Sequence, residues 1–414
     1  MASVTLDHPA AQNPASLWRN RTFLAIWLGH MISILGDGFH SVALGLWVLQ
    51  TTGSAKAMAS VMTVRLIVGV LLGAVAGTAV DRSDRRKLMI ATDVIRFALV
   101  GGVAVLVARP GTPFAAVLLL TGLISVCSQF FNPAFQASLV NIVGKDEVPK
   151  ATSLLQLTNT LTMVVAPVLG GTVVGLWGGW AALVADAASF LLSALLILAG
   201  GTFASPRNEG EQRSFLTDLK AGFGYIRTQP LVRSIVALAP VINFFAAAFQ
   251  VLFPVIVVKL WLASAVQFGS METFFTLGFA LGAAALMALS TRLRRRGWWM
   301  LGGIIVAGAL ISVMSLVHSI PVAFGLMLLM GLSLAFPNLI LQMTLQAEVP
   351  TDVQGRVFGT LSSLCNVASP AAMLIAGILG DWYSPLVILA TSGLLLVGSA
   401  VTSSVFSAGL RDYN

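Results

Sequence analysis

Residues 70–87 read VLLGAVAGTAVDRSDRRK, an apolar run that ends in an acid and then in a cluster of basic residues. About 20 mostly apolar residues are enough for a helix to cross a bilayer. Clustered Lys and Arg mark the cytoplasmic end of such a helix. The stretch therefore predicts a membrane span followed by a short cytoplasmic loop.

The composition of the whole chain supports a membrane protein. Of its 414 residues, 57% are hydrophobic and only 10% are charged, against about 25% charged residues in an ordinary soluble domain. A soluble protein could not hide so much apolar surface. We therefore exclude a soluble enzyme, a nucleic-acid-binding domain and a disordered chain. The net charge of +8 is expected to mark cytoplasmic loops.

Twelve apolar runs are each expected to form one transmembrane helix. They lie at 22–50, 56–80, 88–108, 113–139, 151–177, 179–203, 231–258, 265–290, 298–317, 320–346, 354–381 and 384–408. With the N-terminus in the cytoplasm, 19 of the 24 Lys and Arg residues fall in cytoplasmic segments and three in outer loops (Lys56, Arg109 and Lys259). This asymmetry predicts a multi-pass protein of the cell (inner) membrane with both termini cytoplasmic.

The chain also resembles itself at an offset near 206 residues. Residues 70–87 fall on 279–297, which again end in a basic loop, and Pro167 falls on Pro370. Because six spans separate the copies, the repeat preserves orientation, as in transporters built from two six-helix halves. We expect an all-α membrane protein with two six-helix bundles. The expected segments are a cytoplasmic tail (1–21), the first bundle (22–203), a cytoplasmic linker with an amphipathic helix (204–230), the second bundle (231–408) and a second cytoplasmic tail (409–414).

The loop at 77–87 resembles the signature G-x-x-x-D-R-x-G-R-R/K of the major facilitator superfamily. Asp84 stands where the family has Gly. This departure and the opening LWRNRTFLAIWLGHMISILGDGF (17–39) are similar to the drug-exporting branch that contains macrolide efflux proteins and enterobactin-type siderophore exporters. The resemblance implies twelve helices in the major facilitator fold and a role in export. The matching residues of the loop are Gly77, Asp81, Arg82, Arg85 and Arg86.

The same loop also suggests a gate on physical grounds. A carboxylate at the end of a membrane helix, such as Asp81, can accept hydrogen bonds from free N–H groups of another helix. The loop arginines can bridge to carboxylates at neighbouring helix ends. Asp93 and Arg96, one turn apart, can pair locally and extend the contact. The alternative is that the arginines only set the topology. The expected gating latch comprises Gly77, Asp81, Arg82, Arg85, Arg86, Asp93 and Arg96.

Residues 166–171 in the fifth span read APVLGG. This segment is similar to an exporter signature that ends in G-P-x-x-G-G, with Ala166 in place of Gly. Pro167 removes a helix hydrogen bond and kinks the span, while Gly170 and Gly171 allow a neighbouring helix to approach closely. The resemblance ties this segment to antiport. The alternative is an ordinary proline kink with small-residue packing.

Four ionisable residues lie deep in the predicted spans, where a charge costs at least ~2.5–3.5 kcal/mol. Asp37 and Arg65 lie at similar depths in adjacent spans. We expect them to form an ion pair that is either structural or broken during transport. Glu272, which has no obvious neighbouring base, is expected to carry a proton or to contact a cation. Asp186 is its rival for proton coupling, and the alternative is an interfacial carboxylate that reaches the outer headgroups.

Uncharged polar residues outline a possible pathway. At the repeat offset Asp37 falls on Asn243, which puts a polar position near Glu272 in the second half. Two further sets each follow one helix face, and they either line a substrate cavity or bond helix to helix. These sets are Gln129, Asn132 and Gln136 in the fourth span and Asn338 and Gln342 in the tenth.

The sequence contains no enzyme or metal constellation. There is no phosphate-binding loop, so ATP is not the implied energy source, and we expect no cofactor. We predict a secondary transporter that alternates access around a central site, with a small-molecule substrate, protons and membrane lipid as its partners, no nucleic acid and a monomeric state. The expected activity is export of an amphipathic, macrolide-like compound by proton antiport. The alternatives are export of a dedicated metabolite such as a siderophore, and a lipid-handling or non-transporting protein on the same fold.

Overall fold

The computed structural model describes residues 17–203, 215–289, 295–406, 408–411 and 413. Among these residues the secondary structure is helical, without strands, and twelve helices are long and apolar enough to cross a membrane. The prediction of an all-α membrane protein with twelve spans is therefore confirmed. The first tail falls mostly outside the described residues.

Each predicted span corresponds to one long helix. The first six are α1 (Arg21–Thr52), α2 (Ala55–Arg82), α3 (Arg85–Val107), α4 (Phe114–Val143), α5 (Val148–Trp177) and α6 (Gly179–Ala199). The last six are α8 (Pro230–Val255, continued by η3, Ile256–Leu260), α9 (Ala265–Leu289), α10 (Arg296–Met314), α11 (Ile320–Glu348), α12 (Thr351–Trp382) and α13 (Pro385–Phe406). Shorter helices are η1 (Leu17–Arg19), η2 (Lys145–Glu147), α7 (Phe215–Thr228) and α14 (Ala408–Arg411).

The helices begin and end where local chemistry favours it. Asn20, Ser54 and Asp84 are the N-caps of α1, α2 and α3, and each side chain accepts a hydrogen bond from a backbone N–H of the first turn. Such caps satisfy donors that the helix itself leaves unpaired. Gly53 ends α1 with φ 65°, a left-handed conformation that glycine adopts without steric penalty.

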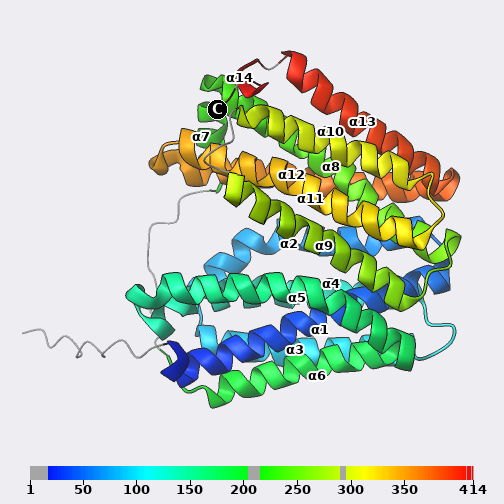
Figure 1. Cartoon of the computed structure of the whole chain (residues 1–414). Coiled ribbons are helices and arrows are strands. Elements are labelled where there is room, and N and C mark those ends of the chain that lie inside the picture. The colour runs from blue at the N-terminus through cyan, green and yellow to red at the C-terminus, as the bar shows by residue number, and fades with distance from the viewer. Residues whose placement is uncertain (1–16, 204–214, 290–294, 407, 412, 414) are drawn as a thin grey trace, which may run out of the picture.

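The spans form two halves, which Figure 1 shows one above the other. Helices α1–α6 pack mainly on one another, and so do α8–α13. The largest contacts between the halves join α5 to α9 and α2 to α12. In the repeat, α5 corresponds to α12 and α9 corresponds to α2. Each of these two contacts is therefore the counterpart of the other, as expected for two repeated halves related by a twofold axis.

Helices α5 and α9 touch through their backbones because glycine lies at both contact points. A Cβ atom on Gly269 would collide with the carbonyl of Pro167, and one on Gly171 would collide with the carbonyl of Ala265. The Thr273 hydroxyl also donates across the contact to the carbonyl of Val164, at 2.6 Å. Small residues of this kind are what membrane helices use to approach closely.

The linker between the halves contains one described helix. α7 packs against α12 and α8, with Ile226 buried and Phe223 exposed. Residues 204–214 and the side chains of 215–220 lie outside the described part of the chain. The amphipathic character of the linker helix at a membrane surface therefore remains a prediction.

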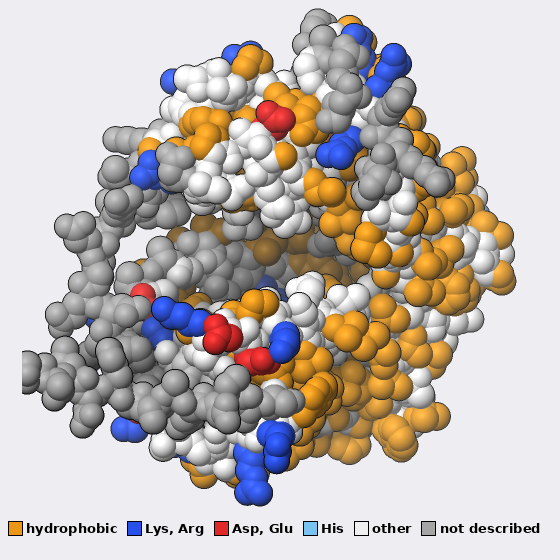
Figure 2. Space-filling view, turned by 60° about the vertical axis from the view of Figure 1, so that its left-hand side comes forward, with side chains coloured by type: hydrophobic (Ala, Val, Ile, Leu, Met, Phe, Trp, Pro, Cys, Tyr) orange, Lys and Arg blue, Asp and Glu red, His pale blue; other side chains and the backbone are white. Residues whose placement is uncertain are grey.

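The loops lie at two ends of the molecule, on the left and right in Figure 1. We call the end where α1 begins, and where residues 82–87 lie, the basic end. The end where α1 finishes and α2 begins is the opposite end. Seen from the basic end, the surface is hollowed between the two halves (Figure 2).

At the opposite end, polar contacts join the halves. The Asp381 carboxylate, at the end of α12, accepts hydrogen bonds from the Ser54 hydroxyl at 2.5 Å and from the Ala55 and Lys56 amides at 2.6 and 3.4 Å. It thus caps the N-terminus of α2 in the other half, where a negative charge is favoured. The Lys259 ammonium donates to the carbonyl of Gly53 at the end of α1. The space between the halves is therefore open at the basic end and closed at the opposite end.

We expect Asp381→Ala to shift this conformational equilibrium. The variant loses the cross-half cap, a change of about 1–2 kcal/mol, which corresponds to roughly a tenfold smaller ratio of closed to open opposite ends. The shift is measured as the distance between spin labels at positions 109 and 316, after Cys127 and Cys365 have been replaced.

Asp84→Ala is the matched control for this experiment. It removes a capping aspartate whose bonds stay within its own half, to Lys87. It should leave the distance distribution unchanged. If Asp381→Ala also leaves it unchanged, the Asp381 cap does not hold the opposite end closed.

Candidate functional site

A cavity of about 600 Å³ lies between the two halves. Helices α1, α2 and α5 line it from the first half, and α8–α11 and α13 from the second. Most of its described lining is apolar, with five methionines and four phenylalanines. Two charged residues line it, Asp37 from α1 and Glu272 from α9. The cavity therefore pairs a deformable apolar wall with one carboxylate from each half.

Both carboxylates are held without a polar partner. Asp37 and Glu272 are half-buried, and within the described part of the chain neither forms a hydrogen bond or an ion pair. Glu272 is placed by its neighbours, since Gly269 and Thr273 make the backbone contacts with α5. A desolvated carboxylate without a partner binds a proton or a cation readily.

The prediction of an ion pair between Asp37 and Arg65 is wrong. Arg65 is exposed on α2 and has no ion pair with Asp37 among the described residues, although its charge lies within electrostatic range of that carboxylate. The reason lies in the packing. Helix α1 packs mainly on α5 and α6, whereas α2 packs on α4 and α12. Neighbours in sequence are thus not neighbours in the bundle.

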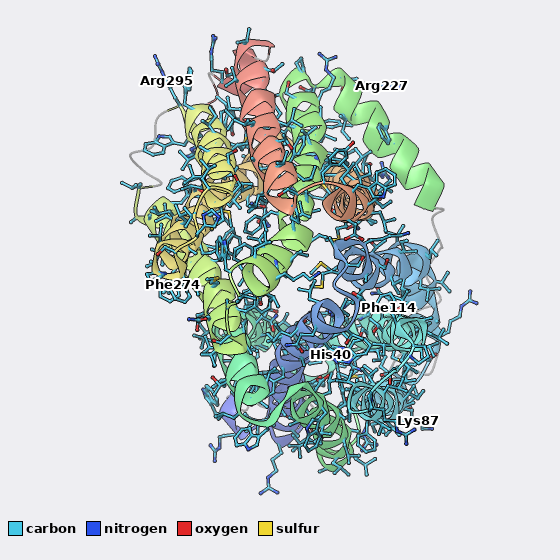
Figure 3. The ribbon with its side chains drawn as sticks, turned by 90° about the vertical axis from the view of Figure 1, so that its right-hand side faces the viewer. His40, Lys87, Phe114, Arg227, Phe274 and Arg295 are labelled. Atoms are coloured by element: carbon cyan, nitrogen blue, oxygen red, sulfur yellow. The ribbon has the colours of Figure 1, made fainter. Side chains whose placement is uncertain are left out.

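The alternative for Asp186, a carboxylate that reaches the outer headgroups, is also wrong. Asp186 is 0% exposed, and its Oδ2 lies 2.9 Å from Nδ1 of His40. Viewed from the opposite end, His40 lies inside the first half, whereas Lys87 and Arg227 lie at the periphery (Figure 3). The side chain faces α1 because α6 packs on α1 and α3. His40 was not among the predicted site residues.

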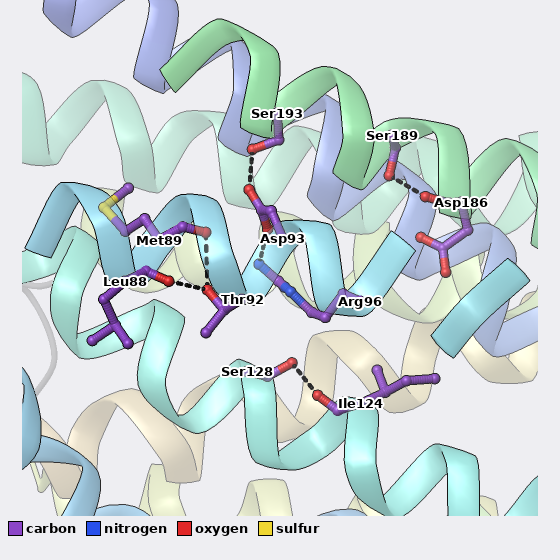
Figure 4. A network of polar contacts seen from close by, with 10 residues as sticks. All are labelled: Leu88, Met89, Thr92, Asp93, Arg96, Ile124, Ser128, Asp186, Ser189 and Ser193. Carbon is purple, nitrogen blue, oxygen red and sulfur yellow. Dashed lines mark hydrogen bonds and ion pairs between the residues drawn. The ribbon is translucent and has the colours of Figure 1, made fainter. Parts of the chain in front are cut away.

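Asp93 and Arg96 form the expected local ion pair, deep between helices (Figure 4). The Ser193 hydroxyl of α6 donates to Asp93 Oδ2 at 2.7 Å. The Arg96 guanidinium lies 4.3 Å from the ring centroids of both Phe131 and Phe190. Asp93 and Arg96 are 0% and 3% exposed. The pair therefore joins α3 to α6 and α4 within the first half.

The sequence profile of the Major Facilitator Superfamily matches residues 26–373. The chain belongs to this superfamily. Across 363 residues it is 21% identical to macrolide efflux protein A of Streptococcus pyogenes, covering 87% of this chain and 89% of that protein. Across 395 residues it is 27% identical to the enterobactin exporter EntS of Escherichia coli O1:K1 / APEC, covering 93% and 92%. The relatives are transporters, in agreement with the prediction from the sequence.

Solved structures show the same fold. A bacterial homologue of the iron transporter ferroportin, in an inward-facing state, superposes with a TM-score of 0.73 at 16% identity, covering 94% of this chain and 100% of that one. A bacterial homologue of the lysosomal transporter Spinster, also inward-facing, superposes with a TM-score of 0.69 at 15% identity, covering 96% of each chain. Both of these solved structures share the helix arrangement of this chain, that of a multi-pass membrane protein.

In this conformation, described contacts of the superfamily's signature loop join it to α4 and α6 of the first half. Asp81 pairs with Arg85 at 3.4 Å, and its side chain is 49% exposed. The Arg85 guanidinium also donates to the carbonyl of Ala137 in α4, at 2.9 Å. Arg86 donates to carbonyls in the last turn of α6, at 3.4 and 2.7 Å, where a cation is favoured. Arg85 and Arg86 therefore reach backbone carbonyls of α4 and α6, and Arg85 also pairs with the Asp81 carboxylate one turn away.

Two further members of the predicted latch, Arg82 and Gly77, lie in the last turns of α2. Arg82 is exposed at the basic end. A Cβ atom on Gly77 would meet no other atom within 4 Å, so no close contact in this conformation requires glycine there. Gly77 and the exposed Asp81 thus leave open space near the end of α2.

The exporter-like segment of α5 lies at the junction of three helices. Pro167 lines the cavity. A Cβ atom on Gly170 would lie 3.0 Å from the Cα of Phe39 in α1, whereas Gly171 faces α9 of the other half. The two glycines therefore serve different contacts, one within the first half and one between the halves.

The predicted polar stripes are not part of this cavity. Gln129 is half-buried, and the other four residues of the stripes are exposed on α4 and α11. Asn243 also does not line the cavity, since its amide donates to the carbonyl of Ala239 and contacts the sulfur of Cys365. The polar position beside Glu272 that we expected at Asn243 is filled by Gln250, two turns further along α8.

Sequence reasoning missed three polar residues of the site. His40 follows Asp37 by three residues, a spacing that places both on one face of a helix and could have revealed it. Gln250 lies in the predicted seventh span and is as polar as the residues that we selected. Asp381 lies at the end of a span, and its helix N-terminal partner is 326 residues away.

Proposed function

We propose that this chain exports an amphipathic cation across the cell membrane in exchange for protons. One observation carries the proposal. A largely apolar cavity between the two halves holds a carboxylate from each half, and neither carboxylate has a partner within the described residues. A ligand with an apolar body and a protonated amine satisfies both features. Macrolide-like drugs belong to this chemical class, and one relative is named for macrolide efflux.

The proton is the second ligand of the same site. Carboxylates inside the membrane carry protons in many transporters, and Asp37 and Glu272 accept either a proton or the cationic end of a substrate. Because the two ligands compete for the same charge, loading one releases the other. We therefore propose proton antiport.

The two ends of the molecule suggest how access alternates. We propose that the basic end is cytoplasmic and that the protein works as a monomer in the inner membrane. When the basic end closes, Asp81 reaches the N-terminus of α12, which begins at that end and has no side-chain cap in this conformation. This contact would mirror the Asp381 cap on α2 at the opposite end. Asp81 would then stabilise the conformation that is closed at the basic end, and Asp381 the conformation that is closed at the opposite end.

The exposed polar residues of α4 and α11 fit this proposal. Polar side chains that face lipid are unfavourable, so such residues normally face a water-filled space or another helix. We propose that Gln136 of α4 and Gln342 of α11 line the path by which the substrate enters from the basic end.

Export of an anionic metabolite is the second candidate. The higher identity is to an enterobactin exporter, and Arg65 is exposed and carries a charge near Asp37. An anionic siderophore would use this guanidinium in place of the carboxylates.

A pair of probes with the same shape and opposite charge distinguishes the two candidates. We expect the purified protein to bind tetraphenylphosphonium about tenfold or more tightly than tetraphenylborate, since opposite unit charges about 7 Å apart attract by roughly 2 kcal/mol at an effective dielectric constant of about 20. Asp37→Asn should reduce this preference. Equilibrium binding in detergent measures both affinities.

The converse result supports the other candidate. Preferential binding of tetraphenylborate that is lost in Arg65→Gln would contradict cation export and favour the anionic metabolite. Binding of neither probe, together with no flux of any compound in a substrate panel, would bring forward a lipid-handling or non-transporting protein.

A further inference from the structure

We propose that His40 and Asp186 form a proton-holding pair that serves Asp37, so that the first half of the transporter releases a proton when a cation binds in the cavity. The inference rests on the proposed function. It adds two residues that do not line the cavity and that act through Asp37. They are therefore positioning residues for the proton.

The pair lies behind Asp37 as seen from the cavity. His40 Nδ1 and Asp186 Oδ2 are 2.9 Å apart, and the residues are 6% and 0% exposed. His40 follows Asp37 by three residues in α1, so the two side chains share one face of the helix. The charges of His40 and Asp186 both act on Asp37. A proton on the pair is thus largely shielded from water, and Asp37 is the carboxylate on the same helix face that lines the cavity.

Gly36 allows the α6 carboxylate to come so close to α1. A Cβ atom at this position would lie 2.6 Å from Asp186 Oδ1 and would collide with the Ser189 hydroxyl. Among the described residues, Asp186 Oδ1 has no hydrogen-bond partner although it is buried. An unsatisfied buried oxygen of this kind is unfavourable, and a proton shared within the pair reduces its negative charge.

The charges around the pair come from four helices. Asp37 lies on α1. The charges of Arg96 on α3 and of Arg65 on α2 also act on Asp37. Arg96 is itself paired with Asp93. Glu272 of α9 lines the same cavity as Asp37. Helix α5, which packs on α1 and α6, has Lys150 as its ionisable residue, at the basic end. Asp186 thus adds its negative charge to that of Asp37, and Arg96 and Arg65 partly offset the two carboxylates.

These charges couple the proton to the substrate. With both carboxylates ionised and His40 neutral, two negative charges share a site of low dielectric constant, which is unfavourable. One proton bound among Asp37, His40 and Asp186 reduces this electrostatic repulsion. A cation that binds at Asp37 supplies the same positive charge, so the proton is no longer favoured. It leaves its nitrogen or oxygen, passes by way of Asp37 and is taken up by water in the cavity.

Proton release on binding tests the proposal directly. Tetraphenylphosphonium is added to purified protein in weakly buffered detergent solution, and a pH indicator counts the protons released while calorimetry gives the affinity. We expect the wild-type protein to release protons. His40→Gln and Asp186→Asn should release about one proton fewer per bound cation and should shift the pH profile of release, while the affinity stays within about threefold of the wild type. Ser189→Ala, which changes a neighbouring hydroxyl but no titratable group, should behave as the wild type.

Each outcome separates the inference from the proposed function. If the wild type binds the cation without releasing protons, proton antiport fails and the inference fails with it. If the wild type and both variants release the same number of protons with the same pH profile, only the inference is overturned.

A second measurement covers the case in which the variants do not fold. In a chain with His8, His30 and His318 replaced, the infrared spectrum of isotopically labelled His40 should change on addition of tetraphenylphosphonium. An unchanged spectrum overturns the inference.

Discussion

Glu272→Gln is expected to abolish the accumulation of tetraphenylphosphonium that a pH gradient drives in proteoliposomes. Glutamine has nearly the same shape, so the cavity keeps its form, but it neither carries a proton nor presents a negative charge. Loss of one opposite charge about 7 Å from the phosphonium centre costs roughly 2 kcal/mol at an effective dielectric constant of about 20, so binding at the cavity should also weaken by roughly 10- to 100-fold. Uptake of the radiolabelled cation, with the membrane potential clamped, measures the effect.

Glu147→Gln is the control for this substitution. It makes the same chemical change in a residue that pairs with Lys150 near the basic end, outside the cavity. Its uptake should match that of the wild type. Full gradient-driven uptake in Glu272→Gln would remove this carboxylate from the mechanism.

The Arg96→Met variant should lose about 3–5 kcal/mol of stability, because it leaves the buried Asp93 carboxylate without its partner. The substitution also removes the contacts of the guanidinium with Phe131 and Phe190. Combining it with Asp93→Asn should recover a large part of the loss, since no unpaired charge then remains. Thermal and denaturant unfolding in detergent give the free energies.

Arg65→Met is the matched control, because Arg65 is exposed and makes no ion pair with the described residues. This substitution should change the free energy of unfolding by no more than about 0.5 kcal/mol. If Arg96→Met is as stable as this control, or if the double variant is no better than Arg96→Met, the buried pair does not hold α3 against α6 as we describe.

Features that depend on composition and period could be read from the sequence. The twelve spans follow from long apolar runs, and the basic loop at 82–87 begins where α2 ends. The repeat predicted two halves, and the exchange of the α5–α9 and α2–α12 contacts under a six-span shift agrees with it. Glu272 was selected because it is a lone acid in a span, and it lines the cavity.

Features that depend on which helices touch could not be read in this way. The pairing of Asp37 with Arg65 assumed that consecutive spans pack together, but α1 packs on α5 and α6. The position of Asp186 within its predicted span marks it as a candidate, but this position does not reveal that its side chain faces His40. Asp381 could not be found, because its role depends on a helix N-terminus in the other half.

Gradient-driven flux tests the central claim most directly. Proteoliposomes with an acidic lumen, held at zero membrane potential with potassium and valinomycin, are placed in tetraphenylphosphonium, with protein-free liposomes as the control. The account predicts that the cation accumulates against its own gradient while protons leave the lumen, and that reversing the pH gradient reverses the flux. Uptake that is independent of the pH gradient, or no uptake beyond that of protein-free liposomes, would contradict it.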